Sequence, residues 1–226
     1  KLNNMRIGQR LGMGFGLLIV MMLSIVAVAL LRFNDVSAIN NRIIEKDWVK
    51  ADAANIVNAT TRANARLSMQ LVITEDTTQI TRIQADINTN KKAISDAQNT
   101  LDQLVYLPQG RQLLAQLKQA REQYGASFTQ VANLVKQGER AQANALMLSE
   151  TLPRLDALQS PITQLTALQK KVVQQSSQEL QDQLHAAGIL MLTIGTMGAL
   201  SGAAFAWWVT RSITRPISQA VTLAKT

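Results

Sequence analysis

Residues 11–31 read LGMGFGLLIVMMLSIVAVALL, and residues 186–209 read AAGILMLTIGTMGALSGAAFAWWV. Neither stretch contains a charged side chain. At about 1.5 Å of rise per residue, helices over these ranges are roughly 31 and 36 Å long, enough to cross a bilayer hydrocarbon core of about 30 Å. The sequence therefore predicts transmembrane helices at 11–32 and 186–209, the second ending in Trp207 and Trp208 at a headgroup interface.

The first of these stretches has an alternative interpretation as a signal peptide that is cleaved from the mature protein. Its apolar run is longer than the core of a typical signal peptide. In addition, no small-x-small cleavage motif follows in residues 31–34. We therefore expect an uncleaved membrane anchor at this position.

Charged residues are distributed asymmetrically around the two apolar stretches. Residues 1–10 and 210–226 each carry basic side chains and no acidic one, whereas the nearly neutral segment 33–185 carries all 15 acidic residues. Because basic residues are enriched on the cytoplasmic side of membrane proteins, we expect both ends in the cytoplasm and 33–185 outside. The net charge of +8 reflects this topology. No basic stripe carries interleaved aromatic residues, so we expect no nucleic-acid partner.

Side chains that commonly carry chemistry are scarce in this chain. Cysteine is absent, and the one histidine, His185, lies at the start of the second apolar stretch. This composition excludes disulfides and thiolate metal sites. The segment 33–185 has no glycine-rich phosphate loop, and its carboxylates are scattered rather than paired. We therefore expect no catalytic residue, no metal, no cofactor and no enzymatic activity.

Apolar residues in 33–185 recur at alternating steps of three and four, as they do in helices that pack together. Polar or Pro/Gly-containing turns interrupt the pattern near residues 75, 109 and 138. The predicted helices cover 35–74, 77–107, 110–137 and 139–185. The first helix has the weakest stripe, formed by Val36, Ile39, Ile43, Ala53, Ile56, Ala63 and Leu67. The predicted fold is all-α: an up-down-up-down antiparallel four-helix bundle continuous with two transmembrane helices.

The last predicted helix contains two prolines, Pro153 and Pro161. Each proline lacks a backbone N–H and crowds the preceding helical turn. Two interpretations stay open. Either 139–152 is a separate short helix, with Pro153 near the start of the long one, or the prolines kink a single helix that can move.

The segment 210–226 directly follows the second apolar stretch. Pro216 is predicted to begin a helix here, with apolar residues spaced four, three and four apart at Ile213, Ile217, Ala220 and Ala224. This segment resembles the first helix of a HAMP domain, the parallel helical linker of bacterial transducers. The resemblance implies that a second such helix follows in the intact protein.

The order of the predicted segments resembles that of methyl-accepting chemotaxis receptors, with residues 5–11 and the stretch 121–124 as looser matches. The resemblance implies a multi-pass protein of the bacterial inner membrane, embedded in lipid, with 33–185 as a periplasmic ligand-binding domain. It further implies a homodimer that controls a cytoplasmic kinase and adaptor through a missing C-terminal part. The GxxxG patterns Gly12–Gly16 and Gly198–Gly202 are compatible with helix contact in the membrane.

Two alternatives to a chemotaxis receptor remain. Sensor histidine kinases with two transmembrane helices share the same front end, and the residues after Thr226 would distinguish them. A periplasmic module that recognises another protein, rather than a small molecule, is the other alternative. We expect a small-molecule ligand.

The first candidate binding site lies on the first predicted helix. Asn58, Arg62 and Arg66 are spaced four apart and share one face, where a guanidinium pair suits a carboxylate ligand. The resemblance to aspartate-type chemoreceptors implies that such arginines act with polar groups at the start of helix four, where Thr151 lies. The family's third arginine on helix one has no counterpart here.

A second candidate is Arg121 with Tyr124 on the third predicted helix, facing the bundle interior. Some receptors of this group bind organic acids in a pocket of this kind within one protomer. Either site would take a small carboxylate, such as a dicarboxylate or tricarboxylate. A solvated face or an internal ion pair is the alternative for any of these arginines.

Overall fold

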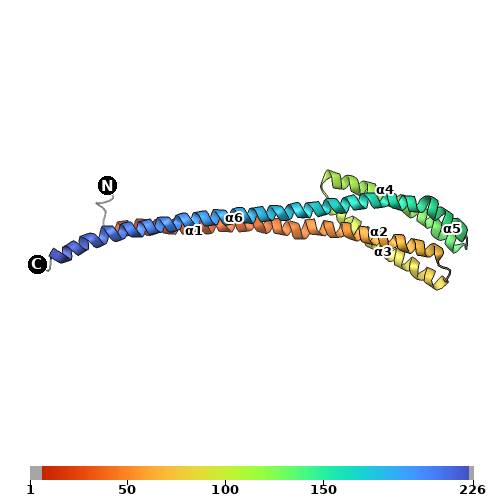
Figure 1. Cartoon of the computed structure of the whole chain (residues 1–226), viewed down its shortest axis with the longest axis horizontal. Helices are drawn as coiled ribbons and strands as arrows, with labels where there is room; N and C mark the ends of the chain where they lie inside the picture. The colour runs from red at the N-terminus through yellow and green to blue at the C-terminus, as the bar shows by residue number, and fades with distance from the viewer. Residues whose placement is uncertain (1–6, 224–226) are drawn as a thin grey trace. The chain divides into compact units, whose positions relative to one another are not determined.

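The computed structural model describes residues 7–223, and the side chains of the last helix up to Arg211. These residues form only helices and short connections (Figure 1). The helices are α1 (Ile7–Arg42), α2 (Trp48–Ile73), α3 (Thr77–Leu104), α4 (Pro108–Lys136), α5 (Arg140–Leu146) and α6 (Leu152–Leu223), with π-helical turns at Ile43–Asp47 and Met147–Thr151. The chain divides into two compact units, of which one comprises residues 41–177 and the other the flanking residues.

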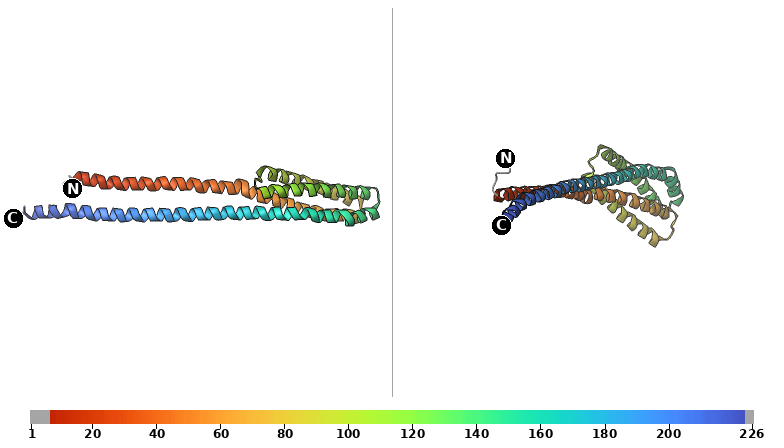
Figure 2. Two further views of the ribbon diagram at one scale, coloured as in Figure 1. Left: turned by 90° about the horizontal axis from the view of Figure 1, so that it is seen from above. Right: turned by 60° about the vertical axis from the view of Figure 1, so that its left-hand side comes forward.

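The unit 41–177 is a bundle in which α2, α3, α4 and the α5–α6 segment lie side by side (Figures 1 and 2). Its interior contains the fully buried side chains of Leu71, Leu101, Leu117, Val131, Ile162 and Leu165. At about 25 cal/mol per Å² of buried apolar surface, such side chains contribute roughly 1.5–3 kcal/mol each. The predicted all-α four-helix bundle is confirmed.

The turns between these helices follow from local sequence. The Asp76 carboxylate caps α3 by accepting a hydrogen bond from the backbone N–H of Thr78 at 2.8 Å. Leu107 precedes Pro108 and is extended, with φ −65° and ψ 133°, because a following proline disfavours the helical conformation. The second predicted helix therefore ends at Leu104 rather than at residue 107.

Gly138 ends α4 in a left-handed conformation, with φ 81°. The N–H of Glu139 bonds to the carbonyl of Leu134 at 2.9 Å, and the N–H of Gly138 bonds to that of Val135 at 3.1 Å. These two bonds define a Schellman motif, which satisfies carbonyls that the helix end would leave unpaired. Glycine is favoured here because a side chain would be strained at this φ.

The structure does not separate 139–152 as a helix of its own, because the chain is helical at every residue from Arg140 through Pro153, with a π-helical turn between α5 and α6. α5 is followed by the π-helical turn 147–151, in which the N–H of Leu152 bonds to the carbonyl of Met147, five residues back. Pro153 is the second residue of α6, where a missing N–H is tolerated. Pro161 lies inside α6.

The other unit contains parts of α1 and α6, and its helices are long and apolar enough to cross a membrane. A side chain at Gly14 would collide with the ring of Phe205, and side chains at Gly198 and Gly202 would touch Met21 and Leu18. The Gly198–Gly202 pair therefore lies at a contact between α1 and α6, as small residues in membranes do. Side chains at Gly12 and Gly16 would meet nothing within 4 Å, so this pair makes no such contact.

The end of α6 differs from the sequence prediction. α6 continues without a break through Pro216 to Leu223, so the prediction that this proline begins a new helix is wrong for the backbone described. The side chains of the predicted HAMP segment after Arg211 lie outside the described residues, as do residues 1–6 and 224–226. The HAMP assignment stays a prediction.

Candidate functional site

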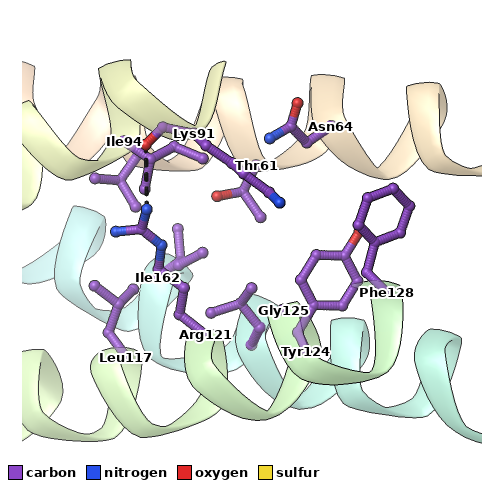
Figure 3. A pocket seen from close by; sticks show the side chains of 12 residues that line it. Thr61, Asn64, Lys91, Ile94, Leu117, Arg121, Tyr124, Gly125, Phe128 and Ile162 are labelled. Atoms are coloured by element: carbon purple, nitrogen blue, oxygen red, sulfur yellow. Dashed lines mark hydrogen bonds between the residues drawn. The ribbon is translucent and has the colours of Figure 1, made fainter. Parts of the chain in front are cut away.

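A cavity of about 100 Å³ lies inside the bundle, between α2, α3, α4 and α6 (Figure 3). Its walls combine branched apolar side chains with a few polar ones, as small-molecule sites do. The lining residues are Val57, Thr61, Asn64, Lys91, Ile94, Leu117, Arg121, Tyr124, Gly125, Phe128, Leu158 and Ile162.

The α4 wall of the cavity follows a helical stripe. Leu117, Arg121, Tyr124 and Phe128 are spaced four, three and four apart, so they share one face of the helix. The rings of Tyr124 and Phe128 stack with centroids 6.2 Å apart. Gly125 lies between them in sequence, and a Cβ built there would meet no atom within 4 Å. The missing side chain at Gly125 therefore helps to keep the cavity open.

The α2 wall is a core stripe with polar residues at its centre. Thr61, Asn64 and Ser68 are 3%, 6% and 2% exposed, and they continue the stripe that starts at Val57 and ends at Leu71. The apolar stripe predicted for the first helix is therefore only partly right. Its member Ala53 is buried, but Ile56 is exposed, and these three polar residues occupy interior positions instead. A 4-3-4-3 spacing from Val57 through Leu71 is the signal that could have identified them.

Arg121 reaches across from α4 to α3. Its guanidinium donates hydrogen bonds to Oε1 of Gln98, to Oγ of Ser95 at 2.8 Å and to the backbone oxygen of Lys91 at 3.2 Å. Partial burial lowers the pKa of Arg121 from its ordinary value, because the charged form loses solvation. These contacts tie Arg121 to the turn of α3 that carries Lys91.

Lys91 extends its ammonium group over the cavity, toward the side of Thr61 and the aromatic rings (Figure 3). Its Nζ lies 5.6 Å from the centre of the Phe128 ring, a cation–π distance. No carboxylate pairs with it in the part of the chain that the structure describes. Among the described residues, the cavity is lined by two cations, Lys91 and Arg121, and by no acid.

Tyr124 is held in place by a neighbour on α2. Its hydroxyl lies 3.1 Å from Oγ of Ser68, which also donates to the backbone oxygen of Asn64 at 2.7 Å. Burial raises the pKa of Tyr124, and the hydrogen bond between Tyr124 and Ser68 opposes this rise. The ring therefore presents a neutral, fixed wall to the cavity.

The structure separates the predicted site residues. Arg121 and Tyr124 line the cavity, as the second candidate site proposed. Arg62 and Arg66 are exposed on α2 and do not line it, and Asn58 is partly buried with its Oδ1 unpaired. Thr151 is fully buried elsewhere and shares a 2.7 Å hydrogen bond with Ser127 of α4. Sequence reasoning did not identify Lys91, Thr61, Asn64 or Phe128.

A second polar cluster lies in the bundle, around the first π-helical turn. Nζ of Lys50 is 2.8 Å from Oδ1 of Asp47, and both side chains are only 3% exposed. Ser176 of α6 donates a 2.7 Å hydrogen bond to the other oxygen of Asp47, and Lys50 lies 4.8 Å from the centre of the Tyr106 ring. Within residues 7–223, no group of three or more His, Asp or Glu side chains is placed to hold a metal ion.

Comparison with known families identifies the bundle. A family model described as a four helix bundle sensory module for signal transduction matches residues 4–184. No curated protein matches the chain. The matched region covers the whole bundle and all of α1, so the chain belongs to this family of four-helix-bundle sensory modules for signal transduction.

Proposed function

We propose that the chain is the sensory and membrane-spanning part of a bacterial chemoreceptor whose bundle binds a small organic acid. The cavity between α2, α3, α4 and α6 supports this proposal, because its described lining contains two cations and no acid. A buried anion is stabilised only where charged or hydrogen-bonding partners meet it. An organic acid with an apolar body suits both the cations and the apolar walls.

Helix α6 provides a route for the signal, because it lines the cavity and also contains the second apolar stretch. α6 contributes Leu158 and Ile162 to the cavity and continues through the apolar stretch 186–209. A ligand that binds one packing of α6 more tightly than another shifts the balance between them. Typical couplings of this kind amount to about 1–3 kcal/mol. In the periplasmic topology that the charges favour, this shift passes through the inner membrane toward a HAMP helix and a kinase-control module.

Thermal unfolding of the purified chain in detergent micelles tests the binding proposal. We expect at least one carboxylate, from a panel of mono-, di- and tricarboxylates, to raise the melting temperature, since ligands stabilise the state that binds them. Gly125→Leu should abolish the shift by filling the cavity. Ala126→Leu adds one carbon less, on the exposed face of α4, and should preserve the shift. A panel that produces no shift would exclude the cavity as an organic-acid site.

A second candidate site remains on the exposed face of α2. Arg62 and Arg66 have no acidic partner in the described chain, and the unpaired Oδ1 of Asn58 lies on the same helix. In a homodimer this face could bind a ligand carboxylate between protomers, with Thr151 as the corresponding position before α6. A melting shift that survives Gly125→Leu but disappears in the Arg62→Ala, Arg66→Ala double variant would favour this site.

The class of receptor needs a separate test. A chemotaxis receptor, a sensor histidine kinase and a protein-recognition module can share this bundle. Fusion of the chain to the cytoplasmic part of a chemotaxis receptor should give ligand-dependent kinase control. If the purified bundle captures a periplasmic protein but responds to no small molecule, the protein-recognition alternative is favoured.

A further inference from the structure

We propose that Lys91, Thr61 and Asn64 form the carboxylate subsite of the cavity, and that the cavity selects a compact aliphatic monocarboxylate. This inference rests on the proposed function, because it specifies the ligand of the same cavity. It assigns the anion to residues other than Arg121, the cation that sequence reasoning selected.

The three residues offer hydrogen-bond donors that the protein leaves unused. Thr61 is 3% exposed, yet its hydroxyl makes no hydrogen bond in the part of the chain that the structure describes. Oδ1 of Asn64 accepts a 2.9 Å bond from Nδ2 of Asn90, which fixes the amide and leaves its own Nδ2 without an acceptor among these residues. Lys91 adds a full positive charge with only an aromatic partner.

These donors converge on one space. Figure 3 shows Thr61 and Asn64 on α2 and the ammonium group of Lys91 on α3 around the same part of the cavity. A carboxylate has about four lone-pair directions, so it can accept bonds from an ammonium, a hydroxyl and an amide together. A ligand carboxylate that meets these free donors beside apolar walls gains hydrogen bonds that no protein group supplies.

Arg121 is less available for the same role, because its guanidinium already donates three of its five possible hydrogen bonds within the protein. Its donors meet Gln98, Ser95 and the backbone oxygen of Lys91. Arg121 is therefore a positioning residue, which holds the turn of α3 from which Lys91 extends. Its loss should weaken ligand binding through displacement of Lys91 rather than through a missing contact.

The remaining walls limit the body of the ligand. The cavity of about 100 Å³ is smaller than the cavity of roughly 150 Å³ that accommodates benzene in an engineered protein. Beyond the three donors, the walls include Ile94, Leu117, Leu158 and Ile162. The other cation of the lining, Arg121, already donates three hydrogen bonds to α3. A second carboxylate would therefore have to compete with these partners or lose solvation without gaining a partner among the apolar side chains. A short, branched aliphatic acid such as isobutyrate or isovalerate fits these limits better than succinate or benzoate.

Isothermal titration calorimetry on the purified chain in micelles tests the ligand class. We expect isobutyrate or isovalerate to bind more tightly than succinate and benzoate, and isobutyramide, which has the same shape without the charge, to bind at least about tenfold more weakly. Tighter binding of succinate than of every monocarboxylate would overturn the assigned ligand class. If no organic anion binds the wild-type chain, the proposed function itself fails.

Matched variants test the residue assignment. Lys91→Met should weaken binding at least about tenfold, whereas Lys92→Met should leave it unchanged, because both lysines are exposed but only Lys91 lines the cavity. Thr61→Val should weaken binding several-fold and Thr61→Ser should restore it, because only serine keeps the hydroxyl. Circular dichroism confirms that each variant folds. Full affinity in Lys91→Met, together with lost binding in Arg121→Gln, would overturn the subsite while leaving the cavity as the binding site.

Discussion

Two lysines in the same bundle lie in opposite environments. Lys50 is buried at the start of α2, where Asp47 neutralises it and Ser176 satisfies the second oxygen of that carboxylate. Lys91 lies at the mouth of a cavity, and among the described residues its ammonium group is paired with an aromatic ring and with no carboxylate. A carboxylate of the protein compensates the charge of Lys50, whereas no carboxylate among the described residues compensates the charge of Lys91.

The difference separates structural charges from charges available to a ligand. A buried ion pair costs desolvation, which the mutual attraction and the added hydrogen bond offset. Such a pair has little uncompensated charge, and few free hydrogen-bonding groups, with which to bind a ligand. A cation with no acidic partner, beside unused donors on Thr61 and Asn64, retains that capacity. The state of its partners, rather than the presence of a lysine, therefore distinguishes the two sites.

The largest expected effect is on the buried cluster of Asp47, Lys50 and Ser176. Asp47→Ala leaves Lys50 buried without a counter-charge and should lower the free energy of unfolding by about 3–5 kcal/mol. The Asp47→Ala, Lys50→Met double variant should recover most of this loss, because no buried charge then remains unpaired and Arg42, which lies 4.0 Å from Asp47, is 43% exposed. Chemical unfolding of the chain in micelles, followed by circular dichroism, measures both.

Asp52→Ala, at an exposed position of α2, is the control and should change stability little. If the double variant were as unstable as Asp47→Ala alone, the cluster would stabilise the bundle by another route than charge compensation. The contrast with Lys91 would then lose its basis.

A smaller effect is expected at Thr151, which the sequence placed in a ligand site. Thr151→Val leaves the fully buried hydroxyl of Ser127 without its 2.7 Å partner and should lower stability by about 1–3 kcal/mol. Carboxylate affinity should be unchanged, because Thr151 does not line the cavity. Thermal unfolding and calorimetry on one preparation measure the two effects together.

Replacement of both hydroxyls, in Ser127→Ala with Thr151→Val, should be nearly neutral because no buried donor is then left unpaired. A loss of affinity in Thr151→Val without a loss of stability would contradict the structural role. Thr151 would then remain a candidate ligand-binding residue, together with Arg62 and Arg66 of α2.

A stabilising change is expected at the cavity itself. Gly125 lies inside α4 with room for a Cβ, so Gly125→Ala should raise the free energy of unfolding by roughly 0.5–1 kcal/mol. The added methyl group should also reduce the space for a ligand. Gly138→Ala is the opposite control, because a side chain at φ 81° is strained and should destabilise the chain. Equal effects of the two substitutions would indicate that helix propensity does not explain the first.

Much of the fold follows from patterns that the sequence displays without ambiguity. The apolar stretches and the stripes of α3 and α4 locate helices directly, because leucine and isoleucine occupy the interior positions. The α2 stripe was partly misplaced because its centre is polar, and polar residues at core positions weaken the hydrophobic period. Pro153 indicated an irregularity near the start of α6. The sequence did not indicate that this irregularity is a π-helical turn inside a continuous helix.

The candidate site was predictable only in part. Arg121 and Tyr124 follow an interior stripe of α4, so the sequence identified them. Lys91 adjoins Lys92 in a charged stretch of α3, and nothing in the sequence indicates which lysine reaches the cavity. The polar contacts that occupy Arg121 lie on another helix, so its role as a donor depends on packing that periodicity does not encode.

The smallest expected effect concerns the pH dependence of the cavity wall. Burial raises the pKa of Tyr124, so the folded chain keeps this phenol neutral at a pH where the unfolded chain has begun to ionise it. Its contribution to stability is complete below the unfolded pKa of about 10 and is lost as the pH rises through the higher folded value. Stability of the wild-type chain should therefore fall more steeply above pH 10 than that of Tyr124→Phe, measured by chemical unfolding at each pH.

At neutral pH, Tyr124→Phe should cost only about 0.5–1.5 kcal/mol, because Ser68 keeps its 2.7 Å bond to the backbone oxygen of Asn64. A pH slope that Tyr124→Phe leaves unchanged would mean that water reaches the phenol freely. The cavity wall would then be open to water at Tyr124 as well as at the exposed Lys91, and the space would not be enclosed for a ligand.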